Sequence, residues 1–199
     1  MDGYGLSNVG SNNIPFPCSD CVSNVELTSC TYVDGNTWEA IDFVYSRQTD
    51  EGASICKDRV FKVNPEMAKA TTYIPNDTDA LALDRAMKAF NSKLMHIASK
   101  FKVDKDTLAQ IKGPNFKDFT TKYCNLVNSV CKGTMLYCKT VKDNKGYVKI
   151  PKTPTFLQRM DDGPCELKWT AREMAANTAY TPTNGTAVNT PREPVKWGQ

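Results

Sequence analysis

Histidine is almost absent from this sequence, since His96 is the only one among its 199 residues. Most histidine-based acid–base schemes and nucleophilic triads therefore have no residue to use. The chain also contains no Walker loop, no GxSxG motif and no HExxH motif. Asp161 and Asp162 precede a Gly-Pro pair, which is typical of a solvated turn, and nothing in the sequence pairs Asp42 with Asp58. The sequence therefore predicts a binding protein rather than an enzyme.

Long hydrophobic runs are missing as well. No stretch approaches the roughly 18 apolar residues of a membrane span, and the polar, glycine-rich N-terminus does not resemble a signal peptide. We therefore expect a cytoplasmic protein that contacts no membrane. With 40% hydrophobic and 24% charged residues, the composition fits one globular domain. The net charge of +3 is too small to indicate a polyanionic partner by itself, so any nucleic-acid signal must be local.

The cysteines carry little sign of a metal site. They are Cys18, Cys21, Cys30, Cys56, Cys124, Cys131, Cys138 and Cys165. Only Cys18 and Cys21 have the spacing of metal ligands, and no second pair or neighbouring histidine completes a zinc site. The sequence therefore predicts no metal and no other cofactor. Because cytoplasmic thiols stay reduced, we also expect all the cysteines to be reduced.

Three strands are expected in the first third of the chain, after an irregular arm over residues 1–23. They cover residues 25–33, 38–47 and 54–63, and turn-forming Asp, Gly and Asn residues separate them. In the second strand, alternation places Ile41, Phe43 and Tyr45 on one face. In the first strand, strict alternation would place five side chains on one face: Val25, Leu27, Ser29, Thr31 and Val33.

Helices are expected next, because apolar residues recur at spacings of three and four. One apolar stripe consists of Leu83, Met87, Phe90, Leu94, Ile97 and Phe101. A second helix is expected after Gly113-Pro114 and should end near Gly133. Strand character returns over residues 134–141 and 147–150, and a short extended piece covers 155–157. Beyond that, the composition predicts a flexible tail over residues 170–199.

This order of elements predicts a mainly β fold with a helical insert. Three strands, a helical segment and a closing hairpin match the oligonucleotide-binding (OB) fold, which is a five-stranded Greek-key barrel. The helical segment between strands 3 and 4 would be enlarged. We assign residues 24–169 to this domain.

The clearest functional signal lies in residues 132–152, where lysines alternate with tyrosines and the only acid is Asp143. The lysines are Lys132, Lys139, Lys142, Lys145, Lys149 and Lys152. Tyr137 and Tyr147 each precede a lysine by two positions, so that ring and cation share a face of a strand. Single-stranded nucleic acid binds to this combination, because cations attract phosphates and aromatic rings stack on unpaired bases.

The second and third strands repeat the pattern. Tyr45 and Arg47 share a face of the second strand, and Arg59 and Phe61 share a face of the third. These residues are therefore further candidates for contact with nucleic acid. The alternative is that the phenylalanines belong to the core and the lysines only keep the protein in solution.

Six short motifs follow one another along the chain in a distinctive order. They are Gly3-Tyr4-Gly5-Leu6, Asn24-Val25-Glu26-Leu27, Ala40-Ile41-Asp42-Phe43, Leu94-Met95-His96-Ile97, Lys145-Gly146-Tyr147-Val148-Lys149-Ile150-Pro151-Lys152 and Phe156. In order and spacing they resemble a family of small bacteriophage single-stranded DNA-binding proteins. The resemblance spans about residues 3–160, which is most of the chain.

The resemblance implies an OB barrel that coats unwound DNA during phage replication or recombination, in the cytoplasm of the host cell. Phage replication proteins are the further partners that it implies. Two features depart from the family. Cys18-Ser19-Asp20-Cys21 stands where a glycine-containing segment is expected, and residues 170–199 carry a net charge of +1 in place of an acidic tail.

The pattern and the resemblance together give one set of expected DNA contacts. They are Tyr45, Arg47, Arg59, Phe61, Tyr137, Lys139, Tyr147, Lys149, Lys152 and Phe156. Two other classes of function stay open. A structural protein of a phage particle also tolerates a plain fold with irregular ends, and a metal-dependent nucleic-acid enzyme would use the carboxylates or the cysteines. Binding to a single-stranded oligonucleotide tests the first alternative, and metal content with turnover tests the second.

Overall fold

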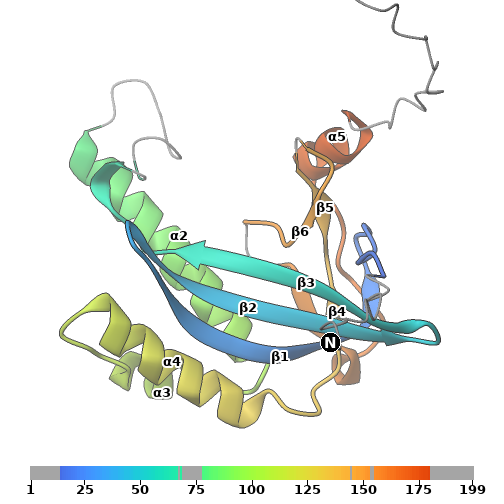
Figure 1. Cartoon of the computed structure of the whole chain (residues 1–199), viewed down its shortest axis with the longest axis horizontal. Coiled ribbons are helices and arrows are strands. Elements are labelled where there is room, and N and C mark those ends of the chain that lie inside the picture. The colour runs from blue at the N-terminus through green and yellow to red at the C-terminus, as the bar shows by residue number, and fades with distance from the viewer. Residues whose placement is uncertain (1–13, 67, 69–77, 144, 153–154, 180–199) are drawn as a thin grey trace, which may run out of the picture.

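A computed structural model of the chain describes residues 14–66, 68, 78–143, 145–152 and 155–179 (Figure 1). Its centre is a five-stranded antiparallel sheet with the order β3-β2-β1-β4-β7. The strands are β1 (Val22–Gly35), β2 (Trp38–Thr49), β3 (Gly52–Phe61), β4 (Leu136–Cys138) and β7 (Leu157–Arg159). A second, two-stranded sheet consists of β5 (Val141–Lys142) and β6 (Val148–Lys149). The three expected strands of the meander are confirmed, each within a few residues of its expected bounds.

The helices lie between β3 and β4 in the sequence, as expected. They are α2 (Asp79–Ser99), α3 (Lys105–Gln110) and α4 (Phe116–Val130). Thr78 and Asn115 cap the first turns of α2 and α4 with side-chain oxygens, as short polar residues at this position commonly do. The C-terminal part of the apolar stripe of α2, with Phe90, Leu94 and Ile97, is buried in the core, whereas Met87 is exposed. The short helix α3 was not expected and has no buried residue.

The expected face pattern of β1 is wrong in its second half, because a β-bulge interrupts the strand. The pairing with β2 shifts between Leu27 and Ser29, where β1 holds one extra residue. Beyond the bulge, Cys30 points into the core and Thr31 is exposed. The Asn128 side chain of α4 binds the backbone of Cys30, accepting from its N–H and donating to its C=O, both at 2.8 Å. In the described residues β1 pairs with β4 at Val22 and Val25, so the backbone groups of Cys30 have no strand partner on that side. Asn128 supplies the hydrogen bonds that such a partner would otherwise make.

The strand order is that of a Greek key. Three consecutive antiparallel strands are followed by a long helical connection that returns β4 to the free side of β1. β7 then pairs with β4 and completes the sheet. β3 is the edge strand at the other side of the sheet from β7, and β6 lies beside it. Within the described residues no ladder joins β3 to β7, so the sheet is open and does not form a closed barrel.

Segments near both ends of the described chain pack on the strands, Ile14 and Phe16 on the five-stranded sheet and helix α5 beside β5. Ile14 forms a β-bridge with Ser54, and Phe16 is buried, although both belong to the expected irregular arm. At the other end, the segment expected to be a flexible tail begins with helix α5 (Ala171–Ala179). Glu173 of α5 forms an ion pair with Lys139 at 2.9 Å. The remaining parts of the expected arm and tail, 1–13 and 180–199, lie outside the described residues.

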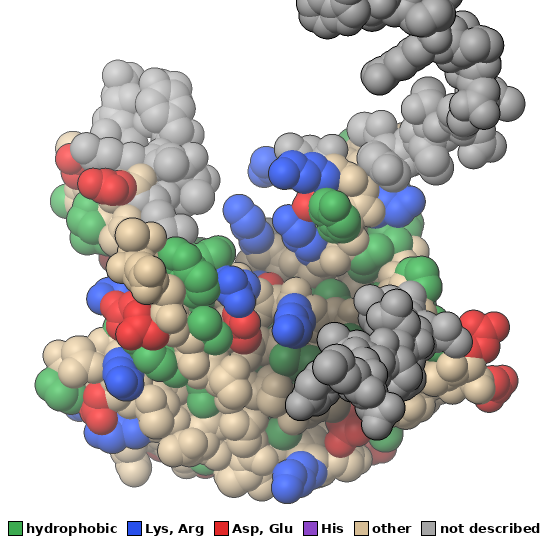
Figure 2. Space-filling model, in the orientation of Figure 1, with side chains coloured by type: hydrophobic (Ala, Val, Ile, Leu, Met, Phe, Trp, Pro, Cys, Tyr) green, Lys and Arg blue, Asp and Glu red, His purple; other side chains and the backbone are tan. Residues whose placement is uncertain are grey.

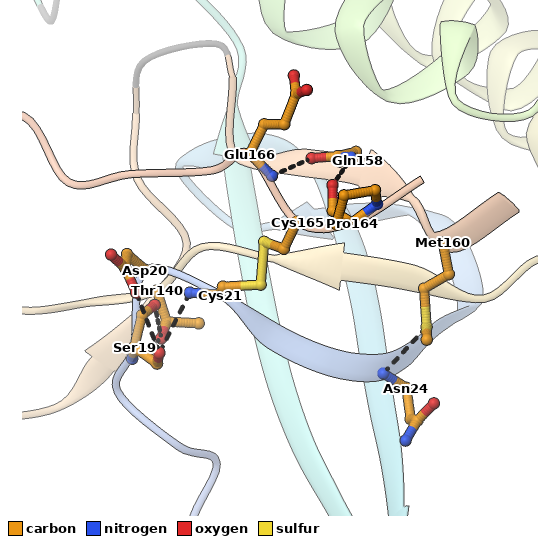
Figure 3. Close-up of a disulfide and its surroundings, with 10 residues drawn as sticks. All are labelled: Ser19, Asp20, Cys21, Asn24, Thr140, Gln158, Met160, Pro164, Cys165 and Glu166. Atoms are coloured by element: carbon orange, nitrogen blue, oxygen red, sulfur yellow. Dashed lines mark hydrogen bonds between the residues drawn. A yellow bond between two sulfur atoms is a disulfide. The ribbon is translucent and has the colours of Figure 1, made fainter. Parts of the chain in front are cut away.

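A disulfide joins Cys21, next to the start of β1, to Cys165, beyond β7 (Figure 3). The expectation that all cysteines are reduced is therefore wrong for this pair. The two residues are 144 positions apart in the sequence, and only the return of β4 and β7 to the side of β1 brings them together. Cys21 is thus held by Cys165 instead of acting with Cys18 as a CxxC unit. The other six cysteines are free thiols.

No helix in the described ranges is long and apolar enough to cross a membrane.

Candidate nucleic-acid interface

One face of the β1–β3 meander is covered by helices and the other is not. Figure 1 shows β1, β2 and β3 side by side with α2 passing behind them. On the covered face, Ile41, Phe43 and Tyr45 are fully buried. Alternation turns the neighbouring side chains to the uncovered face, and the register of β2 with β3 aligns them. We call this set the open face; its residues are Trp38, Asp42, Val44, Lys57, Arg59 and Phe61.

Aromatic rings occupy one end of the open face. Trp38 and Phe61 meet edge to face, with ring centroids 5.5 Å apart. The guanidinium of Arg59 lies 4.6 Å from the centroid of Trp38. On the adjoining turn, a Cβ atom at Gly35 would come within 2.4 Å of the Trp38 ring, so only glycine leaves room for the ring in this position. Trp38 was missed in the sequence, although its place directly after the Asp34-Gly35-Asn36 turn puts it on the same face as Val44.

Arg59 does not present a free charge on this face. Its Nε and Nη2 atoms donate to the two carboxylate oxygens of Asp42, both at 2.7 Å. This hydrogen bonding raises the pKa of Arg59 above its already high ordinary value. Lys57 is the next outward residue of β3 and is exposed, and no acidic residue in the described ranges forms an ion pair with it. The uncompensated positive charge on β3 is therefore that of Lys57 rather than that of Arg59.

Two hollows border Phe61, which is 38% exposed. The turn hollow, about 390 Å³, lies between the β1–β2 turn, Trp38, Phe61 and Lys62. The helix hollow, about 280 Å³, lies between the end of β3, α2 and Lys152. Phe61 and Lys62 line both, so the ring forms the wall between them. Of the expected contacts, Arg59, Phe61 and Lys152 are thus brought together around the helix hollow.

The β5–β6 hairpin carries the remaining exposed candidates. Tyr147 is 67% exposed. Asp143 accepts the backbone N–H groups of Lys145 and Tyr147, both at 2.9 Å, and pairs with Lys149 at 2.6 Å. These contacts, with Lys149 the largest, hold the pKa of Asp143 below its ordinary value. Figure 2 shows Lys and Arg side chains gathered over β3 and this hairpin, so the cationic surface continues from one to the other.

Three of the expected contacts are buried instead. Tyr45 and Phe156 have no exposed surface, and Lys139 is 1% exposed. Burial raises the pKa of Tyr45 well above its ordinary value. Phe156 packs against His96, with ring centroids 4.8 Å apart, and Lys139 is held by Glu173 and by the backbone carbonyl of Lys168. Being buried, none of the three can touch a polymer in this structure. The sequence did not predict this, because alternation shows which side chains share a face of a strand but not which face the helices cover.

The last two expected contacts lie away from the open face. Arg47 shares the side of β2 that carries Tyr45, and its Nε donates to the backbone carbonyl of Ser23 at 3.1 Å. Tyr137 is partly exposed on β4, where it stands opposite Gln158 of β7. The open face, the β5–β6 hairpin and the border of the helix hollow therefore hold Arg59, Phe61, Tyr147, Lys149 and Lys152 of the ten expected residues.

The carboxylate of Asp58, unlike that of Asp42, is turned away from the open face. It pairs with Lys93 of α2 at 2.7 Å, and both side chains are less than 10% exposed. Burial raises the pKa of Asp58, although Lys93 opposes this effect. The pair ties α2 to β3, since breaking a buried ion pair leaves an uncompensated charge. Among the described residues no group of three or more potential metal ligands comes together.

Comparisons with known proteins add no family to this description. No protein-family model, no curated protein and no solved structure matches the chain. The residues of the open face and the hairpin are therefore the features from which a function can be inferred.

Proposed function

We propose that this protein is an OB-fold protein that binds and coats single-stranded DNA with little sequence preference. The fold part of the proposal is supported by the strand order. The OB fold is a five-stranded, partly open Greek-key barrel, and the order β3-β2-β1-β4-β7 is an open five-stranded Greek key. β6, which lies in the connection between β4 and β7, contacts β3 at the far edge of the sheet.

The observation that carries the binding function is the Trp38–Arg59–Phe61 cluster on the open face. OB folds bind oligonucleotides on the face of strands 2 and 3 and with the loops that join strands 1 to 2 and 4 to 5. In this chain these are the open face, the turn beside Gly35 and the β5–β6 hairpin with Tyr147. The exposed rings of Phe61 and Tyr147 can stack on unpaired bases of any sequence, whereas the paired bases of a duplex are already stacked on each other. Trp38 is half-buried and supports Phe61 edge to face.

Charge supports the same choice of partner. Lys57, Lys145 and Lys152 lie on the open face, the hairpin and the border of the helix hollow, next to the exposed rings, whereas Lys149 is paired with Asp143. Cations that follow a phosphate backbone release counterions on binding, so affinity should fall as salt rises. We propose a coating role in phage DNA replication or recombination, with no catalytic step.

The experiment is a titration of a fluorescent oligo-dT with the full chain at two salt concentrations, with a duplex of equal length as competitor. Trp38→Ala and Phe61→Ala should each weaken binding by roughly 1–3 kcal/mol at both salt concentrations. Leu81→Ala is the matched control, since Leu81 is an exposed apolar residue of α2 outside the open face. Equal affinity for the duplex, or unchanged affinity in both ring variants, would count against the proposal.

A further inference from the structure

The helical layer has an apolar groove on the side that faces away from the sheet. One part of it, about 250 Å³, lies between α2, α3 and α4. Its lining is mainly apolar, with Leu94, Met95, Leu108, Ile111, Phe119 and Tyr123. A second hollow of about 340 Å³ continues it along α2 and is lined by His96, Ser99 and Val103. Met95, Lys105 and Leu108 line both, so the two hollows form one groove.

The groove is separate from the open face. Tyr123 lines the groove, and its ring also contacts Phe43 on the covered face of the sheet, with centroids 6.4 Å apart. The sheet therefore lies between the groove and the open face, and a partner in the groove would leave the proposed DNA path free.

The shape of the groove favours a helix over a small molecule. Along α2 the lining runs from Asn91 to Ser99, which corresponds to about 12 Å of helix. Two hollows over this length match two bulky side chains about one or two turns apart on an amphipathic helix. Met95 is 42% exposed at their junction, and its flexible side chain can adapt to such an anchor.

The rim of the groove is cationic. Lys105 lines both hollows, and Lys100, Lys102 and Lys112 each adjoin a lining residue in the sequence. Within the described ranges, none of these four lysines forms an ion pair. Of the nearby acids, Asp104 is engaged by the backbone N–H and the hydroxyl of Thr107, at 2.6 and 2.8 Å. Asp106 is the acid left on α3, so positive charge predominates.

From this apolar floor and cationic rim, we propose that the groove binds an acidic amphipathic helix of another protein. The apolar side chains of that helix fill the two hollows, and its carboxylates face Lys105 and the neighbouring lysines. The proposal does not depend on DNA binding, because it rests on the opposite side of the sheet.

The test uses a fluorescent peptide of about 16 residues, long enough to form an amphipathic helix when bound. The probe has glutamates and alanines, with leucines four and three residues apart on one face. One control peptide has the same residues in an order that scatters the leucines, and a second keeps the leucines but replaces glutamate with lysine. The probe should bind at least tenfold more tightly than either control, and more weakly as salt rises.

Variants of the full chain then locate the site. Met95→Glu and Lys105→Glu should each weaken probe binding at least fivefold. Both side chains are exposed, so both variants should fold. Leu81→Glu, at an exposed position on the same helix, should leave binding unchanged. Equal binding of the scattered peptide, or unchanged probe binding in both groove variants, would overturn the proposal.

Discussion

Arg59 is bound to Asp42 through two hydrogen bonds of 2.7 Å while its guanidinium lies over Trp38. This geometry predicts that Arg59 acts on DNA through the ring that it supports and not through its charge. Arg59→Gln should weaken oligo-dT binding by about 0.5–1 kcal/mol, the size of an exposed cation–π contact. The slope of log affinity against log salt should stay as in the wild type, because no phosphate contact is lost.

Lys57→Gln is the matched control on the same strand and face. Its charge is not compensated by an ion pair within the described residues, so its loss should lower the salt slope by up to about 0.7. The measurement is the dissociation constant of each variant at four or more salt concentrations. A fall in slope for Arg59→Gln equal to that for Lys57→Gln would show that Arg59 does contact phosphate.

Two of the three tyrosines expected as DNA contacts, Tyr147 and Tyr45, should behave in opposite ways. Tyr147 is 67% exposed, so Tyr147→Ala should weaken DNA binding by roughly 1–3 kcal/mol without changing the melting temperature. Tyr45 is fully buried, and its hydroxyl has no hydrogen-bond partner in the described part of the chain. Tyr45→Phe removes an unsatisfied polar group and should therefore leave DNA binding unchanged and stability equal or higher.

Calorimetry and oligo-dT titration of both variants check this prediction. A loss of binding in Tyr45→Phe, with the protein still folded, would place the covered face in the DNA path. Unchanged binding in Tyr147→Ala would instead remove the tip of the β5–β6 hairpin from the site.

The order of strands and helices could be predicted from the sequence because it depends on local periodicity. The meander over β1–β3 and the helices α2 and α4 follow from alternation and from apolar spacing within short windows. The covered face of the sheet could not be predicted, because it depends on where α2 and α4 dock. The docked helices leave Arg59 and Phe61 on the open face and enclose Tyr45 and Phe156 in the core, although the sequence grouped all four as DNA contacts.

Long-range contacts account for the other differences. The bulge at Thr28 inverts which side chains of β1 face the core, and no distinctive residue at this position predicts a bulge. Helix α5 is held on the domain by the pairing of Glu173 with Lys139, which are 34 positions apart. The pairing of Cys21 with Cys165 similarly depends on the returned strands, since the spacing of eight cysteines alone allows many pairings.

The disulfide between Cys21 and Cys165 predicts a clear dependence of stability on reduction. It closes a loop with a sequence separation of 144, for which chain-entropy models give a stabilisation of roughly 3–5 kcal/mol. Cys165→Ser should therefore lower the melting temperature by several degrees or more. A thiol reductant should lower that of the wild type by a similar amount and have little further effect on the variant.

Cys18→Ser is the control, because Cys18 is a partly exposed free thiol that forms no disulfide and whose Sγ donates to Asn177 Oδ1 at 3.7 Å. It should melt like the wild type with and without reductant. Mass spectrometry under non-reducing conditions would check the pairing itself. If the wild type melted at the same temperature when both thiols are free, the disulfide would not contribute to the stability of the fold.

The acid sensitivity of the fold should depend on His96, the only histidine. Its Nε2 accepts the backbone N–H of Leu157 at 3.2 Å, which ties α2 to β7 and requires the neutral ring. Burial, followed by the positive charges of Lys100 and Lys93, lowers the pKa of His96 to about 4 from an ordinary value of 6.5. Above pH 6.5 the ring is neutral in both the folded and the unfolded chain, so its contribution to stability is complete there.

Between pH 6.5 and about 4 the unfolded chain binds a proton at His96 that the folded chain does not bind. The free energy of unfolding should therefore fall as pH falls through this window, by about 1–3 kcal/mol in total, and His96 should add no further loss below it. His96→Gln provides the comparison, because a glutamine oxygen can still accept the N–H of Leu157 but does not titrate. Urea unfolding of both proteins at several pH values between 7.5 and 4 should give a difference that shrinks steadily as the pH falls. Parallel curves for the two proteins would show that His96 titrates normally in the fold and that carboxylates alone set the acid sensitivity.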